Sequence, residues 1–314
     1  MEIKDQGKDV PRTETQILDS IISNRRSLIR LGGTALAGLA FAGIAKAQTA
    51  VTDNDILNFA LNLEYLEAEY YTIAASGMTI DQMGIGVDGT GTQGSVTVKG
   101  DSAASAQVSF TTPAFQSYAQ EIATEERKHV SFLRNALGTA AVAQPAVDLL
   151  NSFNGLAVAA GIGPSFDPFA NQINFLLGSY VFEDVGVTAY HGAAGLISSA
   201  TILDAAAGIL AVEAYHAGLI RTVLYGLDAA NPAVGINAIA TKISTARAAL
   251  DGTNNDDVGL GVVTNSLGSA STIVNADSNT IAFSRTTAQV LSIVYAGGKG
   301  SGGFFPAGLN GTIK

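Results

Sequence analysis

Two segments of the sequence share a pattern that can bind a metal ion: a glutamate followed three residues later by a histidine. They are Glu126–His129, with the sequence ERKH, and Glu213–His216, with the sequence EAYH. On a helix, residues three apart lie on one face, so each pair can direct a carboxylate and an imidazole at the same point. The chain has only three histidines, and two of them in matching positions indicate a shared chemical role.

The segments that precede these pairs also match each other. Glu64 is followed seven residues later by Tyr71, and Glu183 is followed seven residues later by Tyr190. The interval from this first glutamate to the next Glu-x-x-His pair is 62 residues in the first half of the chain and 30 in the second. The difference is close to the length of a Gly-rich segment at 76–112, so without that insertion the two halves would be near-copies.

Such a duplicated arrangement supplies four carboxylates and two imidazoles to the interior of a helical bundle. Carboxylate oxygens suit hard cations, and imidazole adds affinity for iron or manganese. Four glutamates carry a charge of −4, which two divalent ions would neutralise. Without metal, some of the carboxylates would have to bind protons. The constellation therefore predicts a site for two iron or two manganese ions.

The residues around this set leave alternatives open. Glu64 is favoured as the ligand of the first helix by its spacing to Tyr71, but Glu67 lies one turn further on and is an alternative ligand or a group that supports one. Tyr71 and Tyr190 either donate hydrogen bonds to ligand carboxylates, which would orient the site, or are ordinary buried tyrosines. A single Glu-x-x-His pair would usually lie on a solvated face, whereas two matched pairs are harder to explain in that way.

Three further polar residues lie beside the expected ligands in the sequence. Glu125 and Asp184 are each next to a ligand, so on a helix they point about 100° away from it. They are expected on the surface or behind a ligand. His191 follows Tyr190, off the ligand face, and is expected to be a structural or surface histidine.

Apolar periodicity and helix-capping residues place these patterns on an all-α fold. Four long helices are expected, with a long crossover between the second and third, which is the connectivity of a four-helix bundle. Their predicted ranges are 52–75, 113–137, 168–197 and from the break at 198–200 to about 225. The bundle domain spans 48–230, with an inserted loop or hairpin at 76–112 and a short helix near 146–159 in the crossover. Residues 231–314 are expected to add helices at 232–250 and 284–296 and a Gly-rich tail.

Composition excludes several other classes of protein. The chain of 314 residues has no cysteine, which rules out disulfides, thiolate metal sites and cysteine nucleophiles. The hydrophobic fraction of 47% is too high for a disordered protein. The formal net charge is −10, and nucleic acids and anionic membranes both need clustered positive charge in a partner. The expected partners are metal ions and small oxidants, with no nucleic acid, and assembly into a homo-oligomer stays open.

The first 47 residues have the features of a twin-arginine signal peptide. The paired Arg25–Arg26 precedes an uncharged stretch at 31–45, and Ala45–Ala47 is a small-x-small cleavage pattern. The apolar stretch is shorter than the roughly 20 residues that a membrane-spanning helix needs. We therefore predict an exported protein, periplasmic or extracellular, with no membrane attachment after signal cleavage. Cleavage would leave 10 basic and 22 acidic residues, a net charge of −12.

At these residues the sequence resembles the ferritin-like superfamily, and in particular an exported ferritin-like family that includes desiccation-related and stress-associated proteins. Four segments carry the resemblance, Asp55–Tyr71, Glu125–Gly138, Phe166–Tyr190 and Ala206–Leu224. The C-terminal block from IAFSRTTAQVL to FFPAGLNG is similar as well. The resemblance implies a ferritin-like four-helix bundle and the following metal ligands: Glu64, Glu126, His129, Glu183, Glu213 and His216.

The resemblance also implies a role in stress protection. The leading hypothesis is an oxidoreductase whose metals react with oxygen, peroxide or ferrous iron. The alternative hypothesis is a structural or desiccation-protective protein in which the metals only stabilise the bundle. The insertion at 76–112 and the long C-terminal region depart from a compact ferritin and argue against a closed storage cage of 24 subunits.

Overall fold

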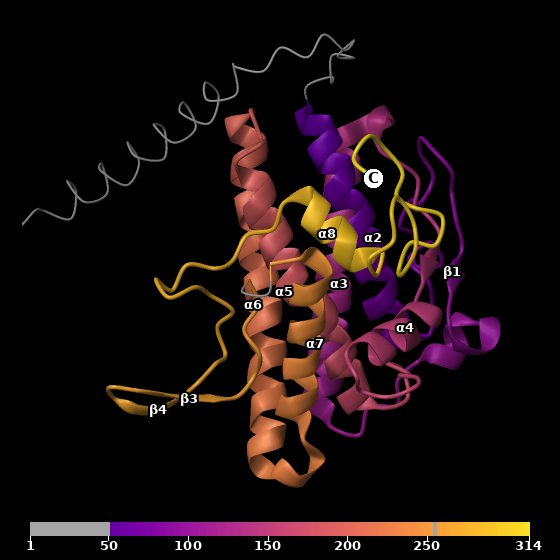
Figure 1. Cartoon of the computed structure of the whole chain (residues 1–314). Coiled ribbons are helices and arrows are strands. Elements are labelled where there is room, and N and C mark those ends of the chain that lie inside the picture. Colours follow the sequence, from indigo (N-terminus) through magenta and orange to yellow (C-terminus); the bar gives the residue numbers. More distant parts are fainter. Residues whose placement is uncertain (1–50, 254–255) are drawn as a thin grey trace, which may run out of the picture. The chain divides into compact units, whose positions relative to one another are not determined.

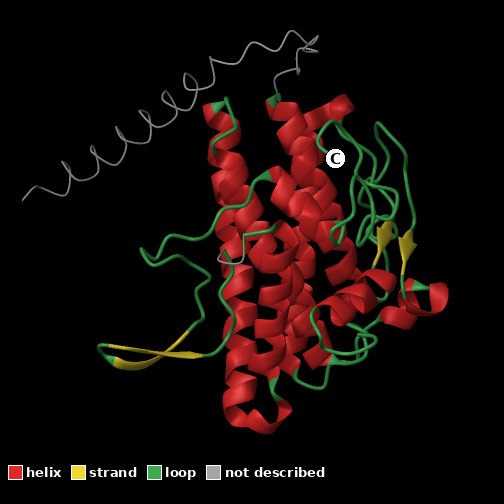
Figure 2. Cartoon of the chain, in the orientation of Figure 1, coloured by secondary structure: helices red, strands yellow, loops and turns green. Residues whose placement is uncertain are grey.

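The computed structural model describes residues 51–253 and 256–314, so the signal peptide predicted at 1–47 lies outside the described residues. Four long helices form a bundle, and the all-α prediction is confirmed (Figures 1 and 2). They are α2 (Asp53–Ser76), α3 (Pro113–Leu137), α5 (Gln172–Ala194) and α6 (Ala200–Ala230). Helix α2 packs along α3, α5 packs along α6, and α2 also contacts α5.

Capping residues set where these helices begin and end. Thr52 and Asp55 form a capping box at the start of α2, and Gly77 ends that helix with a left-handed φ of 70°. The side chain of Asn171 accepts hydrogen bonds from two backbone N–H groups in the first turn of α5. Helix α5 therefore begins directly after this cap, and the start predicted at Pro168 is wrong.

The Gly-rich segment between α2 and α3 is a loop and not a β-hairpin. It contains the two-residue strand β1 (Val96–Thr97) and the short 3-10 turns η1 (Lys99–Asp101) and η2 (Ala103–Ala106). Strand β1 pairs in parallel with β2 (Val147–Asp148), which lies in the connection between α3 and α5. The insertion is thus tied to the crossover, because its strand finds a partner distant in sequence rather than within the segment itself.

Further helices come before α5 and after α6 along the chain. The crossover carries η3 (Gly138–Ala140) and α4 (Asn151–Ala159). After α6 come η4 (Pro232–Val234), α7 (Ile236–Asp251) and α8 (Thr287–Val294). The predicted fifth helix therefore starts later than Pro232, which lies in the 3-10 turn. Helix α7 packs against α5, α6 and α8, and α8 also contacts α5 (Figure 1).

Between α7 and α8 the chain forms an antiparallel hairpin that the sequence analysis did not predict. Its strands are β3 (Val262–Asn265) and β4 (Gly268–Ser271). In Figure 1 the hairpin extends away from the bundle, and all four residues of β3 are exposed.

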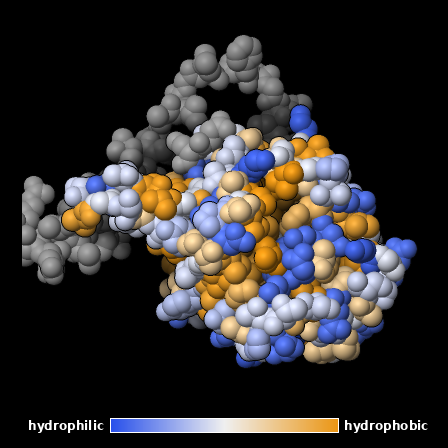
Figure 3. All heavy atoms as spheres, turned by 90° about the horizontal axis from the view of Figure 1, so that it is seen from below, coloured by the Kyte–Doolittle hydropathy of each residue, from blue (hydrophilic) through white to orange (hydrophobic). Residues whose placement is uncertain are grey.

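Seen from the lower end of the bundle, hydrophobic residues gather in a strip between polar areas of the surface (Figure 3).

Helix α6 is long and apolar enough to span a membrane, by length and composition alone. It nevertheless carries Glu213, His216 and Arg221, which are all buried inside the protein. These polar side chains face partners on the other helices of the bundle, as described below. Helix α6 therefore turns one face, which carries these polar residues, into the bundle, while the rest of its surface is largely not buried.

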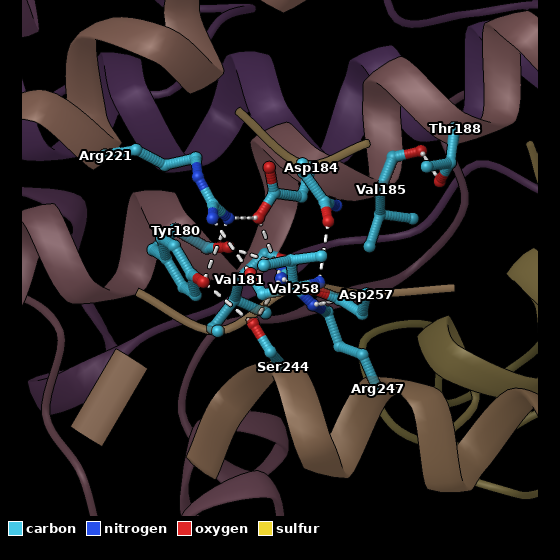
Figure 4. Close-up of polar contacts among 12 residues, drawn as sticks. Tyr180, Val181, Asp184, Val185, Thr188, Arg221, Ser244, Arg247, Asp257 and Val258 are labelled. Atoms are coloured by element: carbon cyan, nitrogen blue, oxygen red, sulfur yellow. Dashed lines mark hydrogen bonds and ion pairs between the residues drawn. The ribbon is translucent and has the colours of Figure 1, made fainter. Parts of the chain in front are cut away.

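A buried cluster of ion pairs, called here the arginine cluster, attaches the C-terminal part of the chain to α5 (Figure 4). Asp184, which was expected on the surface or behind a ligand, is only 2% exposed and faces this cluster. Its Oδ2 accepts hydrogen bonds from Arg221 on α6 and Arg247 on α7, both at 2.8 Å. The cluster consists of these three residues together with Asp251, Asp256, Asp257 and Arg285.

The arginine cluster also holds loops of the C-terminal region in place. Arg221 donates to the backbone carbonyls of Val258 and Thr272, at 2.8 and 2.7 Å. Arg247 donates from Nε to Asp257 at 2.8 Å. Because both guanidinium groups are buried, their charge depends on these acceptors for compensation.

We expect Arg247→Ala to lower the free energy of unfolding by about 3–5 kcal/mol, because it leaves Asp184 and Asp257 as buried charges with too few partners. Lys242→Ala is the matched control, since Lys242 is an exposed cation on the same helix. Its loss should stay within about 1 kcal/mol. Denaturant unfolding of both variants tests this, and an equal loss in the two would contradict a structural role for the cluster.

Candidate metal centre

The predicted ligands meet in the interior of the bundle. Helix α2 contributes Glu64, α3 contributes Glu126 and His129, α5 contributes Glu183, and α6 contributes Glu213 and His216. The four carboxylates are at most 1% exposed. Polar groups of this kind at the centre of a helical bundle are costly unless they are paired or coordinate a metal.

Two groups of donor atoms can be distinguished around the two histidines. In the first, His129 Nδ1 lies 3.2 Å from Glu64 Oε2, 3.4 Å from Glu126 Oε2 and 3.6 Å from Glu213 Oε1. In the second, His216 Nδ1 lies 3.0 Å from Glu126 Oε1 and 3.5 Å from Glu183 Oε2. Each group brings its ligand atoms close enough together to hold one metal ion. Glu126 contributes one oxygen to each group and so connects the two positions.

His129 Nδ1 and Glu64 Oε2 are within hydrogen-bond distance of each other, but most of the other donor atoms have no such partner among the described residues. Within the described part of the chain, six buried atoms of the centre lack a hydrogen-bond partner: Glu126 Oε1 and Oε2, Glu183 Oε2, Glu213 Oε1 and Oε2, and His216 Nδ1. Buried polar atoms are almost always paired, so such a concentration needs an explanation. Around an octahedral divalent ion with bonds of about 2.1 Å, neighbouring ligand atoms lie about 3.0 Å apart. The donor set and its spacing therefore fit divalent cations.

The two tyrosines contact the ligands reciprocally. Tyr71 on α2 donates a short hydrogen bond to Oε1 of Glu183 on α5. Tyr190 on α5 donates one to Oε1 of Glu64 on α2. Each tyrosine thereby occupies one oxygen of a carboxylate and leaves the other oxygen facing a histidine, which fixes the orientation of the ligand.

The remaining polar residues near the centre are also placed by the structure. Glu125 accepts a hydrogen bond from His216 Nε2 at 2.7 Å, so it orients that imidazole with Nδ1 turned inward. His191 lies outside the centre, where its Nδ1 is 3.0 Å from the carbonyl of Phe283. Glu67 is buried and lies with Glu183 and Glu213 in a third group of converging carboxylates.

Burial and mutual repulsion determine the charge of the centre. Burial raises the pKa of Glu64 to about 7, although His129 lowers it. Burial and the neighbouring Glu126 hold the pKa values of Glu67 and Glu213 well above the usual range. Burial alone would lower the pKa of His129, but Glu64 and Glu126 outweigh it and raise that pKa to about 11. The metal-free centre therefore retains protons, and metal binding must displace them.

Comparison with known proteins agrees with this fold. The chain matches the family model for the ferritin-like domain over residues 52–226, more than half of its length. It is 31% identical over 251 residues to the desiccation-related protein PCC13-62 of Craterostigma plantagineum, which covers 76% of each chain. It is 28% identical over 274 residues to the ferritin-like catalase Nec2 of Nesocodon mauritianus, which covers 83% of this chain and 84% of that one. No solved structure matches the chain significantly.

The chain belongs to the ferritin-like domain family. The resemblance inferred from the Glu-x-x-His pairs is thus confirmed, and all four helices that carry the centre lie within or across the matched region. Buried clusters of carboxylate and imidazole groups that could hold metal ions accompany this fold.

We expect Glu126→Gln to reduce the metal content at both positions, because Glu126 is the residue that contributes an oxygen to each. Glu64→Gln should affect the position beside His129 more strongly than the other. Glu121→Gln, on an exposed site of the same helix, is the control. Elemental analysis of the purified variants measures the result, and a Glu126→Gln protein with the metal content of the wild type would refute the shared position.

Proposed function

We propose that this protein is a di-metal oxidoreductase that consumes hydrogen peroxide, with iron or manganese as the metal. The observation that carries the proposal is the convergence of unpartnered carboxylate oxygens and an imidazole nitrogen in a buried centre. The similarity to a protein named as a ferritin-like catalase supports peroxide as the substrate. In disproportionation, two molecules of hydrogen peroxide become two of water and one of dioxygen, so no external reductant is required.

The two proposed metal positions are supported by two groups of converging side chains. Glu64, Glu126, His129 and Glu213 would hold one ion, and Glu126, Glu183 and His216 would hold the other. The metals would supply the change of oxidation state that peroxide chemistry needs. None of these side chains is itself a redox group under such conditions, so the protein contributes position, charge and the exclusion of water.

The surroundings of the centre suit a small neutral substrate. A cavity of about 130 Å³ between α3 and α6 reaches Tyr190, and its other lining residues are mostly apolar, among them Leu57, Phe132 and Ile209. The same tyrosine also lines a smaller apolar pocket beside α2. A molecule of two heavy atoms such as hydrogen peroxide fits the larger of these spaces. Tyr190 in turn touches Glu64, so it stands between this cavity and the first metal position.

We expect His216→Ala to lower the rate of peroxide consumption by at least about tenfold, because it removes a ligand of one position. The matched control is His191→Ala, which removes the remaining histidine of the chain without touching the centre. Dioxygen release from hydrogen peroxide, recorded with an oxygen electrode on protein of known metal content, measures both.

The same experiment separates the proposed enzyme from a protein that is only stabilised by metal. If the metal-loaded wild type releases no dioxygen, while a chelator lowers its melting temperature, the metals stabilise the bundle and the peroxide reaction is wrong. If His191→Ala loses as much activity as His216→Ala, the loss in the latter does not report on the centre.

We further propose that the protein is exported through the twin-arginine pathway, which carries folded proteins and would allow the metals to be bound beforehand. The proposal is supported by Arg25–Arg26 ahead of the apolar stretch at 31–45. Replacing both arginines with lysine should retain the full-length precursor inside the cell, since charge is kept but the paired signal is lost. Fractionation and immunoblotting of the two forms test this, and unchanged export would contradict it.

A further inference from the structure

The two halves of the metal centre differ at one pair of equivalent positions. The duplication relates Glu64 on α2 to Glu183 on α5, so the residue three further on is Glu67 in the first half and Gly186 in the second. One helix therefore carries an additional carboxylate where the other has no side chain. The carboxylate of Glu67 is buried, with 6% of the residue exposed.

Gly186 provides the space in which this carboxylate meets another. A Cβ atom built on Gly186 would collide with Oε2 of Glu213 and would lie 3.5 Å from Oε1 of Glu67. Both oxygens therefore face the gap left by the glycine. Glu213 uses its other oxygen, Oε1, in the group around His129, so its Oε2 is free to serve a different position.

Within the described chain, no lysine or arginine balances the carboxylates at this gap, although Glu183 and Glu213 each lie near a histidine. Among the described residues, no lysine or arginine forms an ion pair with Glu67, Glu183 or Glu213, although the arginine cluster supplies two arginines to the neighbouring Asp184. Both oxygens of Glu213 and Oε2 of Glu183 are buried without a hydrogen-bond partner in the described chain. The three carboxylates each place an oxygen within 4.8 Å of the others.

The gap also adjoins a small cavity that leads away from the two inner positions. This cavity is lined by Glu67 and Gly186 and otherwise by apolar residues, including Ile293 and Val294 of α8 and Phe304 of the tail. Glu67 is the one ionisable group in its lining. A cation that approached from this side would meet Glu67 before the histidine-containing positions.

We propose that Glu67, Glu183 and Glu213 form a third cation position beside the two inner ones, suited to a divalent ion such as Mn²⁺ or Fe²⁺. The position offers oxygen ligands alone, so it binds more weakly than the two positions that include an imidazole. It adjoins the small cavity that Glu67 and Gly186 line together with residues of α8. The proposal rests on the metal centre assigned above but not on its peroxide chemistry.

The test is an equilibrium titration with Mn²⁺ of the protein without residues 1–47, after its metal has been removed with a chelator. Free Mn²⁺ is measured by electron paramagnetic resonance. We expect the wild type to bind two equivalents tightly and a third more weakly. Glu67→Gln should lose the third equivalent and keep the first two, because glutamine keeps the shape of the side chain and removes its charge. Gly186→Ala should weaken the third equivalent by about tenfold or more, since its methyl group displaces the Glu213 carboxylate.

The control variant is Glu69→Gln. Glu69 is also a buried glutamate of α2, but it accepts a hydrogen bond from the backbone N–H of Ile80 and points away from the centre. It should bind as many equivalents as the wild type. Saturation of the wild type at two equivalents, or an unchanged third equivalent in Glu67→Gln, would overturn the proposal. Three equivalents in a protein that releases no dioxygen from peroxide would retain the third position and refute the proposed activity.

Discussion

The constraint on which the rest of this structure depends is the compensation of buried negative charge. Two adjacent residues of α5, Glu183 and Asp184, are both almost completely buried. Their side chains point about 100° apart around the helix, one toward the candidate metal centre and the other into the arginine cluster. A carboxylate in such surroundings must have a cation, a set of hydrogen-bond donors or a proton. The protein uses arginine on one side of α5 and, on the other, gathers carboxylates and histidines that could hold metal ions.

This division explains why the chain needs more than four helices. Asp184 is neutralised by Arg221 from α6 and Arg247 from α7, and the second of these lies beyond the bundle. Arg285, just before α8, donates from Nη1 to Thr188 of α5 at 3.0 Å and extends the same network. The C-terminal region therefore covers α5, completes its ion pairs and excludes water from that side of the metal centre. A chain that ended after α6 would leave Asp184 with one arginine instead of two.

Much of this arrangement could be predicted from the sequence because it follows from local spacing. The interval of three residues in each Glu-x-x-His pair and the interval of seven from glutamate to tyrosine are helical periods, so they place side chains on a face without knowledge of the fold. The structure brings these residues together and adds the hydrogen bonds of Tyr71 and Tyr190. The duplication carried further information, because it predicted that the two pairs of helices would contribute equally.

What could not be predicted depends on contacts between distant segments. The strand at 96–97 pairs with residues 147–148, a partner that no alternation within the insertion indicates. Asp184 was expected on the surface or behind a ligand because its neighbour in the sequence was the only guide to its environment. A signal did exist: Arg221 is the single lysine or arginine in α6, and an arginine on the buried face of a helix requires a buried acceptor. Its partner, however, lies 37 residues away.

The departures from exact duplication make the two groups of candidate ligands unequal. The group around His129 includes three carboxylates, Glu64, Glu126 and Glu213, whereas the group around His216 includes two, Glu126 and Glu183. Both groups include Glu126, and the first group has one more carboxylate than the second. A more negative ligand set stabilises a higher charge on the metal, so the two ions of a loaded centre would differ in the ease with which they give up an electron. The absence of a side chain at Gly186 allows Glu213 to take this orientation, and the asymmetry of the centre therefore begins at a glycine rather than at a ligand.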